Sequence, residues 1–216
     1  WLVMCHHFGM YNAAFFGDAR TIDRVYDHGR KDQIAAAAHL YPVTVNAANF
    51  DQHAPHLREL EVIFSTWGMP ALSETQWDSL PRLKAVFYAA GSIQHFAGPL
   101  LARGVIVVSA WQVNAVFVAE FTVAQIILAA KGYFCNSESY MCGRGKNAIP
   151  GRAYHGETVA VLGAGAIGRK VIALLRNFSL RAIVFDPFLS EEDAAALGVE
   201  KVTLEQAFER GFIVTN

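Results

Sequence analysis

The chain has 216 residues, of which 53% are hydrophobic, and its 18 lysines and arginines nearly balance its 19 aspartates and glutamates, giving a net charge of −1. This composition indicates a folded, soluble protein with enough apolar residues for one large or two small cores. Charges of both signs are interspersed, which excludes the basic stripe of a nucleic-acid-binding protein and the polybasic patch of a membrane-surface protein. The three cysteines lack paired spacing, so we expect a reducing compartment and a cytoplasmic protein.

Short apolar runs alternate with helical patterns through the first half of the chain. The predicted strands are residues 12–16, 43–45, 61–66, 85–89 and 105–108. The predicted helices are residues 21–40, which begin at a cap on Thr21 and contain a break at Gly29, and residues 73–80, which end at Pro81. Strands that alternate with helices predict an α/β fold with a doubly wound parallel sheet, here a flavodoxin-like one.

A long helix is predicted over residues 114–133. We expect its apolar face to comprise Val118, Phe121, Ala124, Gln125 and Leu128. Polar side chains interrupt the apolar region at Gln112, Asn114, Glu120 and Gln125. We therefore expect no membrane span, and we expect a polar loop between the helix and residue 158.

The most informative pattern lies at residues 158–187. An apolar run at residues 159–162 enters the glycine turn GAGAIG, residues 163–168, and a helical pattern follows over residues 169–178. We expect Gly163 to make the tight turn, Gly165 to let the backbone approach a pyrophosphate, and Gly168 to let the helix pack closely on the strand. The phosphates would then lie at the helix N-terminus, which favours anions.

A second apolar run, residues 182–185, ends at Asp186. This acid would accept hydrogen bonds from the adenosine ribose hydroxyls, and its charge would repel the additional phosphate of NADP. Residues 187–192 contain no arginine or lysine to bind that phosphate. The sequence therefore predicts NAD as the cofactor.

Beyond Asp186 the pattern predicts two short helices, over residues 191–197 with a cap at Ser190 and over residues 204–210, and the start of a strand at residues 212–214. We thus expect two doubly wound parallel-sheet domains with a boundary near residues 111–114. The first, residues 1–111, would bind the substrate. The second, residues 112–216, would be an incomplete Rossmann NAD-binding domain.

Taken in order along the chain, several segments resemble the NAD-dependent D-isomer-specific 2-hydroxyacid dehydrogenases. These segments are KAVFYAAGS, ARGVIVVSA, NAVFVAEFT, VLGAGAIGRKV and VFDPF. The resemblance covers residues 83–216 strongly and the preceding residues by architecture alone. It implies an oxidoreductase that transfers a hydride between NAD and a small 2-hydroxy or 2-oxo acid of the D series, and a homodimer when complete.

The resemblance also implies site residues. The cofactor-binding residues would be Gly163, Gly165, Ala166, Ile167, Gly168, Asp186 and Pro187, with Thr122 near the nicotinamide. The substrate-binding residues would be Ala90, Gly91, Ser92 and Trp67. Backbone N–H groups at a turn of small residues suit a substrate carboxylate, whereas Trp67 either lines the substrate pocket or packs under its own loop. Residues 91–104 read GSIQHFAGPLLARG where many members have a GxDNID-like run, so the substrate acid stays open.

The family's catalytic arginine, acid and histidine lie further along the chain than Asn216. We therefore assign no catalytic residue and expect a fragment truncated at its C-terminus. Residues 1–9 precede Met10 and are either upstream sequence or a disordered lead. His95 is expected to cap a surface helix, with a proton carrier as the alternative.

Other patterns favour less specific interpretations. Asp51, His53 and His56 are expected on a solvated surface rather than around a metal ion. The segment GRGKN, residues 143–147, is expected to be a linker rather than a phosphate loop. The alternative functions are an NAD-sensing regulator or corepressor-like binding protein of the same fold, and an adenosylhomocysteine hydrolase, against which the weak likeness before residue 80 argues.

Overall fold

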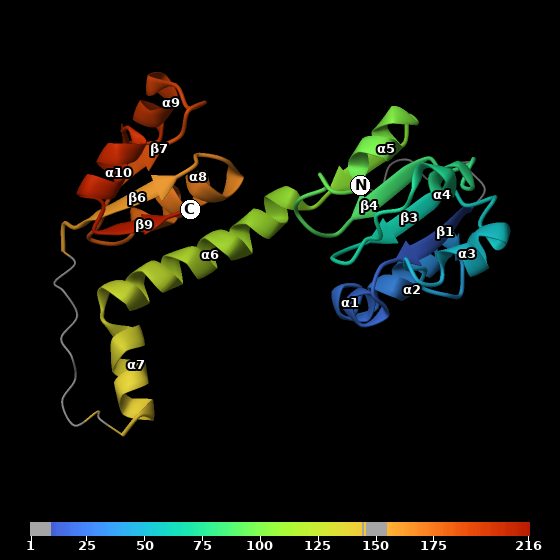
Figure 1. The fold of residues 1–216 in the computed structure, drawn as a ribbon, viewed down its shortest axis with the longest axis horizontal. Helices are drawn as coiled ribbons and strands as arrows, with labels where there is room; N and C mark the ends of the chain where they lie inside the picture. Colours follow the sequence, from blue (N-terminus) through green and yellow to red (C-terminus); the bar gives the residue numbers. More distant parts are fainter. Residues whose placement is uncertain (1–9, 144, 146–154) are drawn as a thin grey trace. The chain divides into compact units, whose positions relative to one another are not determined.

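The computed structural model describes residues 10–143, 145 and 155–216 (Figure 1). The chain divides into two compact units, the first ending at Trp111 and the second beginning at Gln112. Each unit has its own parallel sheet and its own buried core.

The first unit contains a five-stranded sheet in the order β2-β1-β3-β4-β5, and all its pairings are parallel. The strands are β1 (Tyr11–Phe16), β2 (Ala38–Leu40), β3 (Val62–Ser65), β4 (Ala85–Tyr88) and β5 (Ile106–Ser109). This is the order of a flavodoxin-like doubly wound sheet, whose ligands bind beyond the carboxyl ends of the strands. The predicted fold class is confirmed for this unit.

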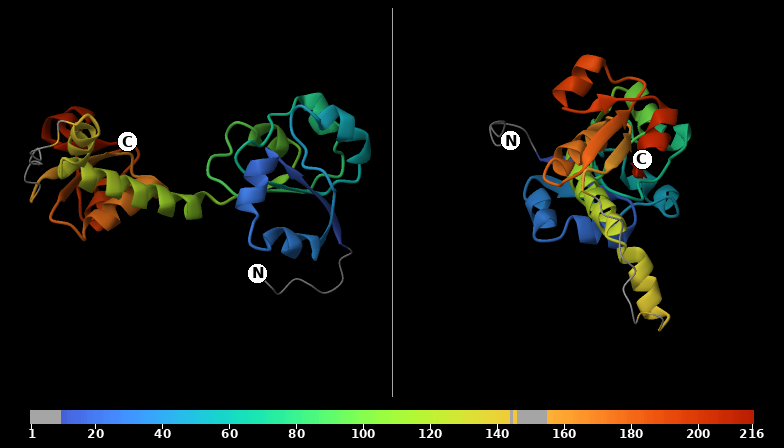
Figure 2. Two further views of the ribbon diagram at one scale, coloured as in Figure 1. Left: turned by 90° about the horizontal axis from the view of Figure 1, so that it is seen from below. Right: turned by 90° about the vertical axis from the view of Figure 1, so that its left-hand side faces the viewer.

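Helices cover both faces of the first sheet (Figure 2). On one face lie α1 (Ala19–Val25) and α2 (Arg30–Ala35), where Ile22 packs against Phe15. On the other lie α3 (Phe50–His53), a 3-10 turn (Ala54–His56), α4 (Glu74–Asp78) and α5 (Ala97–Ala102). Their buried side chains Phe50, Trp77 and Leu100 complete the main core.

The predicted break at Gly29 is confirmed, but three other predictions for residues 18–45 were wrong. The predicted helix over residues 21–40 ends at Ala35 rather than at residue 40, and it is interrupted, as predicted, at Gly29, where His28 and Gly29 adopt positive φ of 56° and 76°. The first helix is capped by Asp18, whose Oδ1 accepts the Thr21 N–H at 2.9 Å, rather than by Thr21. The second strand is residues 38–40 and not 43–45, where Val45 forms only an isolated bridge with Phe16.

The second unit contains a four-stranded parallel sheet in the order β8-β7-β6-β9. Its strands are β6 (Thr158–Leu162), β7 (Arg181–Phe185), β8 (Glu200–Lys201) and β9 (Ile213–Thr215). Its helices include α8 (Ala166–Leu175), α9 (Glu191–Ala196) and α10 (Leu204–Arg210). Counted from β6, the strand order is 3-2-1-4, which is the order of the first four strands of a Rossmann sheet.

The long helix α6 (Trp111–Ala130) packs on the second sheet by a face other than the predicted one. Its buried residues are Ala115, Ala119, Val123, Ile126 and Ala130. Phe121 of the predicted face is 64% exposed. Because the helix is apolar nearly all round, its periodicity does not specify which side is buried. The predicted loop after it is also wrong in part, since residues 133–141 form α7 (Tyr133–Met141) after the left-handed Gly132.

By length and composition α6 could cross a membrane, with a mean hydropathy of 1.8 over the best window, although the sequence pattern argued against a span. Its small and branched residues pack instead in the same core as Val159 and Val161 of β6 and Val171 of α8. A helix that packs on an α/β core passes the same test of length and hydropathy, and this packing accounts for the buried side of α6, which makes up 28% of that window.

Candidate functional site

The glycine turn joins β6 to α8 at the carboxyl end of the second sheet. Gly163 has φ +96°, a conformation that glycine adopts readily and other residues rarely adopt. Gly165 is the N-cap of α8 and has extended backbone angles. A Cβ atom added to Gly165 would meet no protein atom within 4 Å, so the glycine leaves open space beside the helix N-terminus. This space is where a phosphate could approach the backbone closely.

Gly168 has the opposite environment. A Cβ atom at this position would overlap the carbonyl oxygen of Gly163 and would lie 3.4 Å from Cγ1 of Val161. The absent side chain lets the first turn of α8 lie directly against the strand and the turn. The two glycines therefore act differently, since Gly168 is needed for packing within the protein and Gly165 keeps space free outside it.

Asp186 follows β7 and binds the glycine turn with its carboxylate. Its Oδ2 accepts the Ala164 N–H at 2.7 Å and its Oδ1 accepts the Phe188 N–H at 2.7 Å. The hydrogen bond from Ala164, followed by that from Phe188, holds the pKa of the carboxyl below its usual value. Asp186 is therefore a fixed anion, and each carboxylate oxygen retains acceptor capacity for a ligand hydroxyl.

Arg169 holds the same turn from the other side. Its Nε donates to the carbonyl oxygen of Ala164 at 2.8 Å, and its Nη2 donates to Oδ2 of Asp193 at 3.3 Å. The N–H and the C=O of Ala164 are thus both held by charged side chains, Asp186 and Arg169. The sequence analysis did not identify this role for Arg169, which depends on a contact between the turn and α9.

A hollow of about 590 Å³ opens beside Asp186 at the carboxyl ends of β7 and β8. It is lined by Phe185, Asp186, Pro187, Glu191, Lys201, Val202, Thr203, Leu204, Glu205 and Gln206. Apolar and polar side chains alternate along its rim. The volume falls within the range of small-molecule sites, and the position next to an acid that ends the second strand suits an adenosine group.

The charge of this hollow is negative, since Asp186, Glu191 and Glu205 outnumber the single cation Lys201. Lys201 lies 4.0 Å from Glu191, so its charge is partly offset. Lys201 lies outside residues 187–192, the segment in which a cation for the NADP phosphate is expected from the sequence, and only the fold brings it to this hollow. A surplus of carboxylates disfavours a ribose phosphate dianion and leaves a neutral ribose hydroxyl as the better partner of Asp186.

The predicted substrate residues lie at the carboxyl edge of the first sheet. Trp67 follows β3 and is 49% exposed, whereas Ala90 after β4 is buried and Ser92 is exposed. Thr66 Oγ1 donates to the carbonyl oxygen of Ala89 at 3.3 Å and so links the loops that follow β3 and β4. The structure thus brings the Trp67 and Ala90–Ser92 segments to one edge of one sheet, as expected from parallel strands.

The remaining predicted residues lie elsewhere or have other partners. Thr122 is on α6, donates its hydroxyl to the carbonyl oxygen of Val118 at 2.8 Å, and does not line the hollow beside Asp186. His95 packs edge-on against Phe96 at 4.9 Å between ring centroids and is not the cap of α5, because Phe96 is the residue at that position. The expectation of a histidine cap was therefore wrong.

Of the residues considered as metal or phosphate ligands from the sequence, Asp51 and His53 make hydrogen bonds to other protein side chains. Asp51 accepts a hydrogen bond from Gln76 at 2.8 Å, and His53 shares one with the Tyr41 hydroxyl at 2.9 Å. Among the described residues, no group of three or more histidine, cysteine or acidic side chains could hold a metal ion. Most of the GRGKN segment lies outside the described residues.

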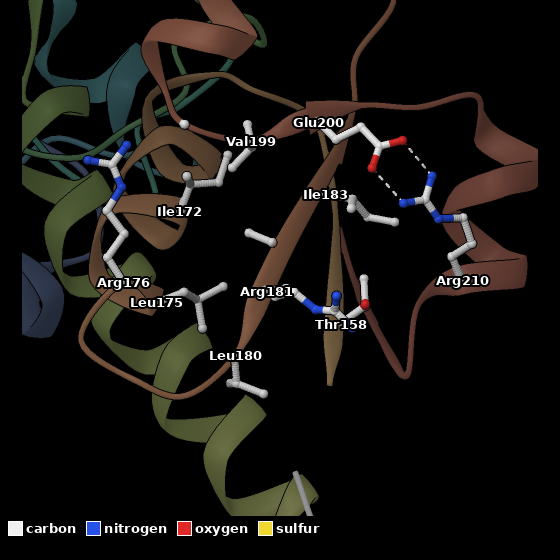
Figure 3. Close-up of a pocket in the computed structure, with 12 residues that line it drawn as sticks. Thr158, Ile172, Leu175, Arg176, Leu180, Arg181, Ile183, Val199, Glu200 and Arg210 are labelled. Carbon is white, nitrogen blue, oxygen red and sulfur yellow. Dashed lines mark hydrogen bonds and ion pairs between the residues drawn. The ribbon is translucent and has the colours of Figure 1, made fainter. Parts of the chain in front are cut away.

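A second hollow, of about 630 Å³, lies at the opposite end of the same sheet (Figure 3). It is lined by Thr158 and Arg181, the first residues of β6 and β7, and by the ion pair of Glu200 with Arg210. Because the glycine turn follows the carboxyl end of β6, this hollow is not continuous with the site at Asp186. No residue of the glycine turn lines it, so we do not assign it as the phosphate site.

Comparison with known proteins gives a family match over the second unit. Residues 123–216 match the family described as "D-isomer specific 2-hydroxyacid dehydrogenase, NAD binding domain". A D-3-phosphoglycerate dehydrogenase of Bacillus subtilis is 33% identical over 123 residues, which are 52% of this chain and 22% of that protein. The match thus spans about a fifth of the length of this curated relative.

Solved structures share the fold at low identity. D-2-hydroxyisocaproate dehydrogenase superposes with a TM-score of 0.74 at 16% identity, covering 94% of this chain and 61% of that one. D-lactate dehydrogenase of Aquifex aeolicus, solved with NAD and lactic acid, superposes with a TM-score of 0.72 at 20% identity, covering 94% and 59%. The two-sheet α/β fold class is confirmed. The match of residues 123–216 to an NAD-binding domain supports the prediction of NAD as the cofactor.

Proposed function

Because residues 123–216 match the NAD-binding domain of the D-isomer specific 2-hydroxyacid dehydrogenases, we propose that the protein transfers a hydride between NAD and a small 2-hydroxy or 2-oxo acid. The observation that carries the proposal is the glycine turn, fixed by Asp186 through the Ala164 N–H at 2.7 Å, beside an acidic hollow of about 590 Å³. The nicotinamide of NAD supplies the hydride chemistry when the cofactor is bound.

Residues of the second unit would bind the cofactor as follows. Asp186 accepts hydrogen bonds from the adenosine ribose hydroxyls, and Pro187 lines the same hollow. The pyrophosphate lies over Gly165, where no side chain intrudes, and takes N–H groups of Ala166 and Ile167 at the first turn of α8. The first turn of a helix has no intrahelical acceptors for these donors, so a phosphate satisfies them.

The substrate would bind at the first unit through its carboxylate. The backbone bends at residues 89–91 after β4, and we propose that main-chain N–H groups of Gly91 and Ser92 receive the carboxylate, as small-residue segments of this kind do for anions. The proposal assigns binding and orientation to residues of this chain, and assigns proton transfer to none of its eight histidines. The names of the curated relatives point to a phosphorylated hydroxy acid, but the acid used by this protein is not thereby fixed.

The exposed side of α6 and α7 supports a homodimer. Phe117 and Phe121 are 65% and 64% exposed, and Tyr133 and Phe134 of α7 add further exposed rings. Exposed apolar patches of this kind commonly mark protein interfaces. Cys135 and Cys142 are free and exposed thiols, which suits a dimer in the reducing cytoplasm.

The test is a screen of the full-length protein for NADH oxidation with a panel of 2-oxo acids. We expect turnover with at least one acid and product of the D configuration. The corepressor-like alternative is not favoured, because the described relatives are dehydrogenases. NAD binding without turnover of any acid in the panel would contradict the proposal and favour that alternative.

A further inference from the structure

A rigid turn presents Trp67 at the carboxyl edge of the first sheet. The Met69 N–H donates to the carbonyl oxygen of Thr66 at 3.1 Å, and Gly68 has φ +90°, as the third residue of a type II turn requires. Thr66 is fully buried and Met69 is 4% exposed, so both ends of the turn are anchored in the protein. Trp67 lies between these two anchored residues, next to Gly68, and is 49% exposed.

The turn is also fixed by its neighbours. Thr66 Oγ1 donates to the carbonyl oxygen of Ala89 at 3.3 Å in the loop after β4. A Cβ atom at Gly68 would lie 3.3 Å from the backbone nitrogen of Asp18, so the turn also lies against the loop after β1. A large indole held on such a support loses little freedom when it binds a ligand, because its backbone is already ordered.

The loops around Trp67 are nearly devoid of charge. The described loops that follow β2, β3 and β4, residues 41–49, 66–73 and 89–96, contain no lysine, arginine, aspartate or glutamate, and His95 is their one titratable side chain apart from tyrosine. The loop after β1 supplies Asp18, and Arg20 follows it in the first turn of α1. Hydrogen bonds from Thr21 hold the pKa of Asp18 below its usual value, so this carboxyl is an anion.

These observations bear on whether the side chain of the substrate acid is phosphorylated or apolar. A phosphate group needs several cationic or N–H donors, commonly arginine. Here it would meet an indole ring, the Asp18 carboxylate and one arginine, Arg20, whose charge Asp18 offsets. An apolar or aromatic side chain needs no charged partner and stacks favourably on an exposed tryptophan. We propose that Trp67 selects a 2-oxo acid with an uncharged, apolar side chain, aromatic ones above all, over a phosphorylated one. This inference rests on the proposed function, since it names the acid used at the same site.

The test measures kcat/KM of the full-length protein for phenylpyruvate, pyruvate and 3-phosphohydroxypyruvate with NADH. We expect phenylpyruvate to exceed pyruvate by about tenfold or more, since each well-packed apolar group contributes roughly that much discrimination, and we expect the phosphorylated acid to be the poorest of the three. Trp67→Ala should lower kcat/KM for phenylpyruvate about tenfold more than it lowers kcat/KM for pyruvate. Trp67→Phe should retain most of the preference because it retains a ring.

The controls separate selection from folding. Phe208→Ala, a similarly exposed aromatic residue at 60% on α10, should leave the substrate ratio unchanged. Should Trp67→Ala not fold, Trp67→Phe and Trp67→Arg supply the comparison, and the arginine variant should favour the phosphorylated acid. A preference of the native protein for that acid, or an unchanged ratio in Trp67→Ala, would overturn the inference alone. Failure to reduce any acid would overturn the proposed function and this inference with it.

Discussion

Gly165 and Gly168 lie three residues apart in one turn, and replacing each by alanine should have opposite consequences. At Gly165 the backbone is extended, with φ −73° and ψ −164°, and an added Cβ meets no atom within 4 Å. Alanine fits this conformation and reduces the freedom of the unfolded chain, so Gly165→Ala should raise the free energy of unfolding by about 0.4–1 kcal/mol. The same methyl group would occupy the space proposed for the pyrophosphate, and NAD affinity should fall.

The size of that fall follows from the contacts that would be lost. A hydrogen bond between a backbone N–H and a charged oxygen contributes about 1.5–3 kcal/mol, so displacing the pyrophosphate from even one donor should weaken NAD binding at least about tenfold. Gly168→Ala differs, because its Cβ would overlap the carbonyl oxygen of Gly163. Overpacking against backbone costs about 1–3 kcal/mol, so this variant should lose stability first.

Urea unfolding followed by circular dichroism and calorimetric titration with NAD separate these effects. We expect Gly165→Ala to unfold at a urea concentration equal to or above that of the native chain and to bind NAD more weakly. We expect Gly168→Ala to unfold at a lower concentration. Native-like NAD affinity in Gly165→Ala would refute the placement of the pyrophosphate over this glycine, whatever the behaviour of Gly168→Ala.

Further predictions concern Asp186 and α6. NAD should bind more tightly than NADP. Asp186→Ala should reduce this difference in affinity, because it weakens NAD binding and removes the repulsion of the NADP phosphate, and titration of both cofactors measures the change. Equal affinities for NAD and NADP in the native protein would contradict the role of Asp186. The pKa of Asp186 in the folded protein lies below its ordinary value of 3.8. The ionised carboxylate therefore stabilises the fold above about pH 3.8, and this stabilisation is lost as the pH falls through the lower, folded-state pKa. The urea concentration at the unfolding midpoint should therefore fall more steeply in acid for the native chain than for Asp186→Asn. If the full-length protein forms the proposed homodimer, Phe121→Lys on the exposed side of α6 should yield a monomer in light scattering, whereas the matched Phe208→Lys on α10 should leave the dimer intact. A dimer in both variants would place the interface elsewhere.

The glycine turn and Asp186 were predictable because local residue types determine both. The residue types of short segments predict the positive φ at Gly163, the close packing at Gly168 and the acid that follows an apolar run. Lys201 and Arg169 were missed because their partners, Glu191 in one case and Ala164 with Asp193 in the other, are brought near by tertiary packing. The hydrophobic periodicity of a single segment does not reveal contacts between side chains that are distant in the sequence.

The misassigned elements have equally specific causes. The alanine-rich run before β2 favours helix by propensity, yet pairing of Ala38 with Tyr11 converts its end to a strand. The break at Gly29 was predictable from the glycine, whereas the left-handed conformation of His28, which a histidine rarely takes, was not. In α6, apolar residues occur on every side, and only contact with β6 and α8 determines which side is buried.

The central claim is that the glycine turn and the hollow beside Asp186 form one NAD site, and NMR titration of the 216-residue chain with NAD tests it most directly. Amide shifts should cluster at residues 163–169, at Asp186 to Phe188, and at residues 201–206 that line the hollow. The amino-end hollow around Thr158, Arg181 and Arg210 should stay unperturbed. Saturable shifts confined to that amino-end hollow, with none at residues 163–169, would contradict the account.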